Sequence, residues 1–299
     1  MSGPVAEPRE LRVPVGDGDL VVAEFGPADG PVVLALHGVT SSSRAWLALA
    51  RNLPEARILA PDLRGRGRSR DLPPSTGLRH HAEDLSALVD ALGLGRVPVA
   101  GHSMGAFVAV SFAARRPDAV ESLLLVDGGL PLPKPAGIPD DGLTAAVLGP
   151  VLRRLETEYP DRDAYLGFWR SHPAFADDFG PEIAAYAEYD LVGEPPHLRP
   201  ATAPAAIAAD ALEIYGPEWY LDALAGLGVP VRLLRSPLGL LAEPDGLYGH
   251  LGSPPEAPVP VIDVPGTNHY TILMTDPGAG IVADALRPAL TRSSEGHPQ

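Results

Sequence analysis

A serine at position 103 lies in a sequence pattern that could support nucleophilic attack on a carbonyl carbon. It is the central residue of GHSMG (residues 101–105), which follows an apolar run and precedes a helical pattern. A serine on a strained strand-to-helix turn needs small neighbours two residues away, so that the strand and the helix can approach each other closely. We therefore predict that Ser103 is a nucleophile at a nucleophile elbow; the alternative is a glycine-rich turn without a chemical role.

A serine at neutral pH needs a base, and His269 is the best placed of the nine histidines. It lies in a glycine-containing loop between the final apolar run, residues 258–264, and the last helical pattern. The alternative is a loop histidine that has no catalytic role. His102 precedes the nucleophile and is expected to be structural. His80 and His81 are expected to be solvent-exposed near a helix start and not to form a metal site.

Acyl transfer also needs two backbone N–H groups that stabilise the negative charge developing on the carbonyl oxygen. Met104, the residue after the proposed nucleophile, can provide one of them. The loop that begins with His37 and Gly38, at the end of an apolar run, can provide the other, for which we expect Val39. A simple strand-ending turn is the alternative interpretation of His37 and Gly38.

Short apolar runs alternate with helical patterns along much of the chain, which predicts an α/β fold with a largely parallel sheet and crossover helices. The first two runs flank a GDGD segment and predict a hairpin. The eight candidate strands cover residues 11–15, 20–25, 31–38, 57–62, 97–103, 121–127, 229–235 and 258–264. The four candidate helices cover residues 44–53, 78–92, 104–115 and 279–290.

This alternation stops in residues 130–226, after the sixth candidate strand. We expect a helical insertion there that covers one end of the sheet. The core would then comprise residues 1–129 and 227–292, and residues 293–299 would form a flexible tail. The insertion contains 16 Asp and Glu residues but only 6 Lys and Arg residues, so its charge disfavours a polyanionic substrate.

Four motifs together resemble those of the α/β-hydrolase superfamily: HG at 37–38, PDLRGRGRS at 61–69, GHSMGA at 101–106 and GTNHY at 266–270. The resemblance covers nearly all of the chain outside the insertion. It implies an α/β-hydrolase fold, a mostly parallel eight-stranded sheet flanked by helices, in which residues 130–226 form a cap domain that shapes the substrate pocket. It also implies that the arginine-rich PDLRGRGRS segment is a structural loop near the active site and not a nucleic-acid-binding patch.

The acid of a Ser-His-acid triad orients the histidine and stabilises its protonated form, and two places in this chain compete for that role. In most relatives the acid follows the seventh strand closely, but residues 236–239 contain no carboxylate, and Glu243 and Asp245 come later. Some relatives, among them the haloalkane dehalogenases, carry the acid at the end of the sixth strand, where this chain has Asp127. A non-catalytic aspartate that caps a turn is also common there. We favour Asp127, with Glu243 as the main alternative.

Composition and charge exclude several other classes of function. The formal net charge of −15 disfavours a nucleic-acid or anionic-membrane partner. The absence of cysteine excludes disulfides, thiolate catalysis and cysteine-ligated metals. The N-terminal residues lack the apolar region of a signal peptide, and no apolar run has the length of a membrane span, so we expect a cytoplasmic protein.

Together these patterns predict a serine hydrolase without a metal or cofactor, which cleaves a carboxylic ester, a lactone or a related acyl compound. The apolar, aromatic and acidic insertion favours a neutral or cationic small organic substrate. Aminopeptidase, carbon–carbon bond hydrolase, thioesterase and acyltransferase activities use the same triad and stay open. A non-catalytic ligand-binding protein on the same fold is the alternative from another class. The oligomeric state is left open.

Overall fold

A mostly parallel eight-stranded sheet forms the centre of the molecule. The computed structural model describes residues 7–134, 137, 138, 142, 149, 151–252 and 256–295. The strand order is β1-β2-β4-β3-β5-β6-β9-β10; β2 pairs antiparallel with β1 and β4, and all other neighbours are parallel. The predicted sheet is thus confirmed. Its strands are β1 (Arg9–Val15), β2 (Gly18–Phe25), β3 (Val32–Leu36), β4 (Arg57–Pro61), β5 (Val97–His102), β6 (Val120–Val126), β9 (Val231–Arg235) and β10 (Val261–Asp263).

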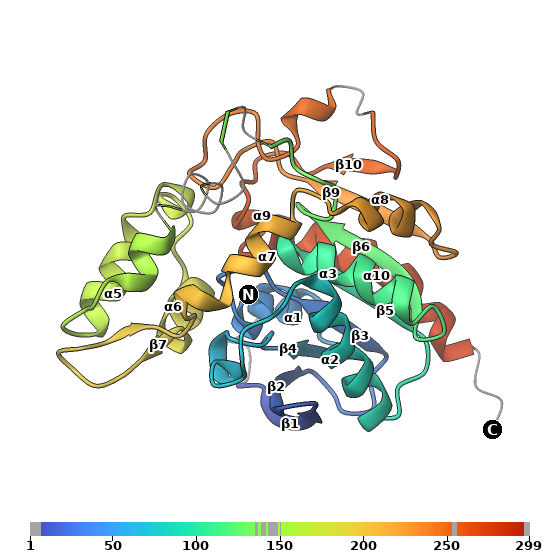
Figure 1. The fold of residues 1–299 in the computed structure, drawn as a ribbon, viewed down its shortest axis with the longest axis horizontal. Coiled ribbons are helices and arrows are strands. Elements are labelled where there is room, and N and C mark those ends of the chain that lie inside the picture. The colour runs from blue at the N-terminus through green and yellow to red at the C-terminus, as the bar shows by residue number, and fades with distance from the viewer. Residues whose placement is uncertain are drawn as a thin grey trace.

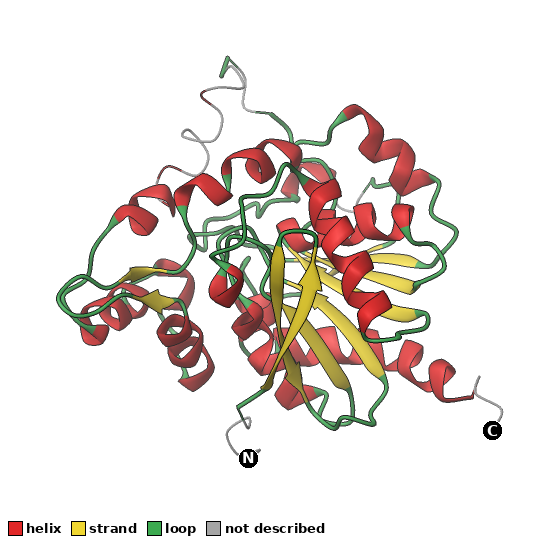
Figure 2. Ribbon diagram, turned by 60° about the horizontal axis from the view of Figure 1, so that its bottom comes forward, coloured by secondary structure: helices red, strands yellow, loops and turns green. Residues whose placement is uncertain are grey.

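Helices cover both faces of this sheet (Figures 1 and 2). Leu88 of α2 and Phe107 of α3 belong to the apolar core on one face, and Leu49 of α1 and Leu286 of α10 belong to the core on the other. The helices outside the insertion are α1 (Leu47–Asn52), α2 (Leu78–Ala91), α3 (Met104–Arg115), α9 (Thr271–Met274) and α10 (Gly278–Glu295), with the 3-10 turns η1 (Ser43–Trp46), η2 (Gly67–Ser69) and η5 (Gly249–Leu251).

The predicted helices differ from the observed ones mainly at their ends. The first splits into η1 and α1, whereas α3 has the predicted bounds. The last helix continues to Glu295, so residues 293–295 of the expected tail are helical. The rest of that tail, residues 296–299, lies outside the described residues.

The insertion between β6 and β9 contains a short antiparallel strand pair as well as helices, which the prediction of a helical segment did not include. Helices α5 and α6 lie to one side of the sheet (Figure 1). Helix α8, in contrast, packs on α3 through Tyr220 and Phe107, whose rings are 5.3 Å apart. The elements are α5 (Arg162–Arg170), η3 (Pro173–Phe175), α6 (Pro181–Tyr189), β7 (Leu191–Val192), β8 (Arg199–Pro200), η4 (Pro204–Ala206), α7 (Ala208–Glu213) and α8 (Glu218–Ala225).

The parallel strands β3, β5, β6 and β10 determine where the candidate functional residues meet. Parallel strands all present their carboxyl ends at the same edge of a sheet. The loop with Val39 follows β3, Ser103 follows β5, Asp127 follows β6 and His269 lies in the loop after β10. The candidate functional residues therefore all lie at this edge of the sheet.

Candidate active site

Ser103 occupies a strained turn between β5 and α3. Its backbone φ is +54° and ψ is −125°, a conformation that residues other than glycine adopt rarely. The preceding strand is buried along its whole length, and α3 begins at Met104. The serine side chain lines a cavity at the carboxyl edge of the sheet, together with Gly38 and His269.

The two glycines of the GHSMG motif are required by close packing. A Cβ on Gly101 would lie 2.4 Å from the Gly105 carbonyl oxygen. A Cβ on Gly105 would lie 2.1 Å from the carbonyl oxygen of Leu36 in the neighbouring strand β3. Both distances are far shorter than van der Waals contact, so any larger residue would push the helix away from the strands and move Ser103.

His269 and Asp127 form a buried pair beside this turn. The ring Nδ1 of His269 lies 2.7 Å from Asp127 Oδ2, and the two residues are 3% and 0% exposed. A hydrogen bond from Nδ1–H to the carboxylate leaves Nε2 as the unprotonated nitrogen that can accept a proton. His269 and Ser103 line the same cavity, although no hydrogen bond joins their side chains in the described residues.

Asp127 is held in place by two hydrogen bonds to the end of β9. Its other carboxylate oxygen accepts a hydrogen bond from Ser236 N at 3.1 Å, and its own N–H donates to the Leu234 carbonyl at 2.8 Å. Its φ of +43° turns the chain sharply after β6. A Cβ on the next residue, Gly128, would lie 2.2 Å from the Ser103 carbonyl oxygen, so this loop packs directly against the turn that carries Ser103.

The alternative acid, Glu243, has a local role in the structure. Its carboxylate accepts a hydrogen bond from Leu241 N at 2.6 Å, within its own loop, and the residue carries no bond to His269. Asp245 has a positive φ of +68° and takes part in the turn of the same loop. Among the three candidate acids in the described chain, Asp127 alone is bonded to the histidine.

The His37 ring fixes the peptide group between Gly38 and Val39, in the loop proposed to bind the oxyanion. The His37 ring accepts a hydrogen bond from Leu63 N at 2.9 Å through Nε2 and donates from Nδ1 to the Gly38 carbonyl at 2.8 Å. Because the C=O and N–H of a trans peptide point in opposite directions, this bond directs the Val39 N–H away from His37. Val39 lines the cavity, and Met104 follows Ser103 in the chain, so both proposed N–H donors are close to the serine.

His102 is buried and bonded to the loop that carries His269. Its Nε2 donates to the His269 carbonyl oxygen at 2.8 Å, and the two rings are 4.7 Å apart. His81 is fully buried and bonded to Asp210, so the expected solvent-exposed position near the helix start is wrong for this residue. No group of three or more His, Asp and Glu side chains in the described part of the chain could hold a metal ion.

Burial of His37 and His102 predicts a loss of stability in mild acid. Desolvation, the largest cause, lowers the pKa of His37 to about 4 and the pKa of His102 to about 3, from an ordinary value of 6.5. Since the folded pKa lies below the unfolded one, the stabilisation is complete above pH 6.5 and is lost as the pH falls towards 4. For His37 the loss is about 3 kcal/mol in the free energy of unfolding.

Urea unfolding of the wild type and of His37→Gln between pH 7.5 and 4.5 measures this loss. We expect the wild type to lose more stability than the variant across that range. His197→Gln is the control, because the His197 side chain is 71% exposed. Parallel pH profiles for the wild type and His37→Gln would contradict the assignment of a buried neutral ring.

The cavity beside Ser103 is lined mostly by apolar and aromatic side chains. Trp169 of α5 and Tyr186 of α6 come from the insertion, and Tyr270 and Met274 follow the histidine loop. The lining residues are Gly38, Val39, Thr40, Ser41, Ala45, His102, Ser103, Val151, Trp169, Tyr186, Leu240, His269, Tyr270 and Met274. None of them is Arg, Lys, Asp or Glu.

Sequence reasoning missed several residues that support this site. Trp169 could not be singled out, because its place on the cavity depends on how the insertion folds. The PDLRGRGRS segment was expected near the active site, but the pairing of Arg66 with Asp210 was not predicted, since the two residues come from distant parts of the chain. Gly128 did leave a signal, because a glycine pair directly after a strand-ending aspartate indicates a tight approach of backbones.

Comparisons with known proteins agree with this architecture. Residues 31–152 match a family described as alpha/beta hydrolase fold. A 2-(acetamidomethylene)succinate hydrolase of Mesorhizobium japonicum is 31% identical over 263 residues, which is 87% of this chain and 88% of that protein. Lipase LipV of Mycobacterium tuberculosis is 46% identical over 114 residues, but this match covers only 38% of this chain and 43% of the lipase.

The solved structure of an E-2-(acetamidomethylene)succinate hydrolase has a similar fold throughout. It superposes with a TM-score of 0.74 at 25% sequence identity and covers 95% of this chain and 99% of the other.

Within the described residues, no helix has both the length and the apolar character needed to cross a membrane.

Proposed function

Because this chain belongs to the α/β-hydrolase family, we propose that it is a cofactor-independent serine hydrolase that cleaves an ester, lactone or related acyl bond. The proposed triad is Ser103, His269 and Asp127. The observation that carries the proposal is the buried hydrogen bond between His269 Nδ1 and Asp127, beside a cavity that Ser103 and His269 both line. A pair of this kind is what a serine needs to act as a nucleophile at neutral pH.

The proposed reaction has two steps. His269 Nε2 takes the hydroxyl proton as Ser103 Oγ attacks the carbonyl carbon, while Asp127 stabilises the imidazolium that forms. The N–H groups of Val39 and Met104 bind the oxyanion, and collapse of the intermediate leaves an acyl group on Ser103 as His269 protonates the departing alkoxide. In the second step His269 removes a proton from water, which attacks the acyl-enzyme and releases the acid.

The lining of the cavity favours a neutral acyl substrate. The relative named above acts, by its name, on a succinate derivative, but the described lining here offers no charged side chain for carboxylates. Arg154 lies 5.2 Å from the Trp169 ring centroid, and its guanidinium is paired with the buried Asp190 at 2.9 Å. We propose that residues 130–226 act as a cap that places Trp169 and Tyr186 around the apolar part of the substrate.

An acceptor group on the substrate is expected to bind Trp169. The Trp169 indole N–H is buried and has no hydrogen-bond partner in the described chain, which costs free energy until a partner binds. For a pair of p-nitrophenyl esters, one with a ketone in the acyl chain and one with a methylene there, Trp169→Phe should lower the preference for the ketone by about tenfold.

Trp46→Phe is the matched control for that experiment, because Trp46 has a buried N–H without a partner but does not line the cavity. Its preference should equal that of the wild type. An unchanged preference in Trp169→Phe, with normal turnover of both esters, would show that the indole N–H does not contact the substrate.

Pre-steady-state kinetics on p-nitrophenyl esters of increasing acyl length test the proposed function. An acyl-enzyme predicts a burst of p-nitrophenolate that approaches one equivalent per protein when deacylation limits turnover. Folded protein that releases no p-nitrophenolate from any ester of the panel would contradict the proposal and would favour the non-catalytic alternative.

A further inference from the structure

We propose that Arg66 is a positioning residue of the oxyanion-binding loop and that Asp210, from the insertion, holds it in place. Docking of α7 on the core would then determine whether the two N–H donors are correctly arranged. This inference rests on the proposed function, because it concerns the residues that bind the oxyanion.

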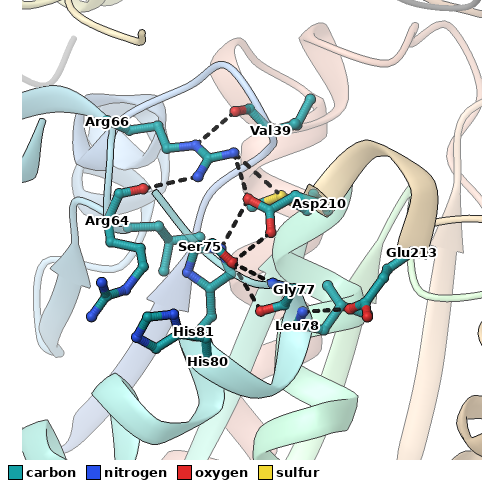
Figure 3. Close-up of polar contacts among 12 residues, drawn as sticks. Val39, Arg64, Arg66, Ser75, Gly77, Leu78, His80, His81, Asp210 and Glu213 are labelled. Carbon is teal, nitrogen blue, oxygen red and sulfur yellow. Dashed lines mark hydrogen bonds and ion pairs between the residues drawn. The ribbon is translucent and has the colours of Figure 1, made fainter. Parts of the chain in front are cut away.

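The Arg66 guanidinium contacts Val39 of the loop after β3, its neighbour Arg64 and Asp210 of the insertion (Figure 3). Its Nε donates to the Val39 carbonyl at 2.9 Å, one Nη donates to the Arg64 carbonyl at 2.8 Å, and the other Nη lies 3.9 Å from Met104 Sδ. The side chain is fully buried. Arg66 therefore fixes the peptide group after Val39, while His37 fixes the peptide group before it.

The carboxylate of Asp210 neutralises the buried positive charge of Arg66. One carboxylate oxygen lies 2.7 Å from Arg66 Nη2 and 3.0 Å from His81 Nε2, and the other accepts a hydrogen bond from Ser75 Oγ at 2.8 Å. Although burial acts to raise it, contacts with His81, Arg66 and Ser75 hold the pKa of Asp210 well below its ordinary value. The carboxylate is thus the counter-charge that a buried guanidinium needs.

The position of Asp210 in the chain links this pair to the insertion. Asp210 lies on α7, 129 residues after His81, whereas Arg66, Ser75 and His81 belong to the core. If α7 moves away from the core, Arg66 loses its counter-charge and with it the geometry that orients the Val39 carbonyl. The Arg66–Asp210 pair therefore connects the docking of α7 on the core with the arrangement of the oxyanion-binding loop.

Asp210→Asn tests this link, since it removes the charge and keeps the shape of the side chain. We expect kcat for a p-nitrophenyl ester to fall by about 10- to 100-fold with KM changed less than about threefold, because the loop stabilises the transition state more than the bound substrate. Glu213→Gln is the matched control: Glu213 lies on the same helix and accepts a hydrogen bond from Leu78 N instead. Its kcat should equal that of the wild type.

A double variant, Arg66→Met with Asp210→Asn, keeps the test informative if the single variant does not fold. It leaves no unpaired buried charge, so it should melt cooperatively, and its kcat should stay low because the Val39 carbonyl has lost its donor. Wild-type kcat in either folded variant would overturn the inference. An inactive wild type would instead contradict the proposed function itself.

Discussion

Replacing Ser103 with alanine should lower kcat for a p-nitrophenyl ester by about 10⁴- to 10⁶-fold. The Ser103 hydroxyl, at the strained turn after β5, forms the covalent bond to the acyl group in the proposed mechanism. What activity persists would come from binding and from the oxyanion-stabilising N–H groups alone. Steady-state kinetics on purified variant and wild-type protein at equal concentration measure the effect.

Ser111→Ala is the control for that comparison. Ser111 lies on the same helix, α3, and is 3% exposed, but it does not line the cavity beside His269. Its kcat should match that of the wild type. Turnover by Ser103→Ala at more than a few per cent of the wild-type rate would mean that another group is the nucleophile.

Replacing Asp127 with asparagine should lower kcat by about 10²- to 10⁴-fold. The carboxylate accepts a hydrogen bond from His269 Nδ1 and so places the unprotonated nitrogen towards the cavity. An amide in its place can donate a hydrogen bond to Nδ1, which favours the other tautomer, and it cannot stabilise the imidazolium. The fold should persist, because the amide oxygen can still accept from Ser236 N.

Glu243→Gln separates the two candidate acids. Glu243 bonds to Leu241 N in its own loop, and a glutamine oxygen can accept the same bond. We expect this variant to keep the kcat of the wild type. Normal turnover in Asp127→Asn together with a collapse in Glu243→Gln would reverse the assignment.

Local patterns were enough to predict the strand-to-helix turn at Ser103 and the sheet. The strand before Ser103 is a short apolar run, the helix after it has the predicted bounds, and the two flanking glycines have a steric reason that sequence alone suggests. All eight strands of the central sheet were predicted, because each is an apolar run bounded by turn residues. These features depend on residues that are close in the sequence, so the sequence is enough to predict them.

The choice of acid and the Arg66–Asp210 pair depend on long-range packing. The sequence does not tell whether the loop with Glu243 folds back to His269. In the structure β6 lies next to β9, and Asp127, which follows β6, is bonded to His269. Arg66 and Asp210 meet only because α7 returns to the core after a long insertion. The strand pair β7–β8 is too short to leave a pattern.

Labelling with a fluorophosphonate probe, followed by intact-protein and peptide mass spectrometry, tests the nucleophile most directly. The probe phosphonylates a serine only where a base and oxyanion donors activate it. The proposed mechanism predicts one adduct per wild-type chain, located on Ser103, and no adduct on folded Ser103→Ala. Folded wild-type protein that stays unlabelled, or that carries the adduct on a different residue, would contradict it.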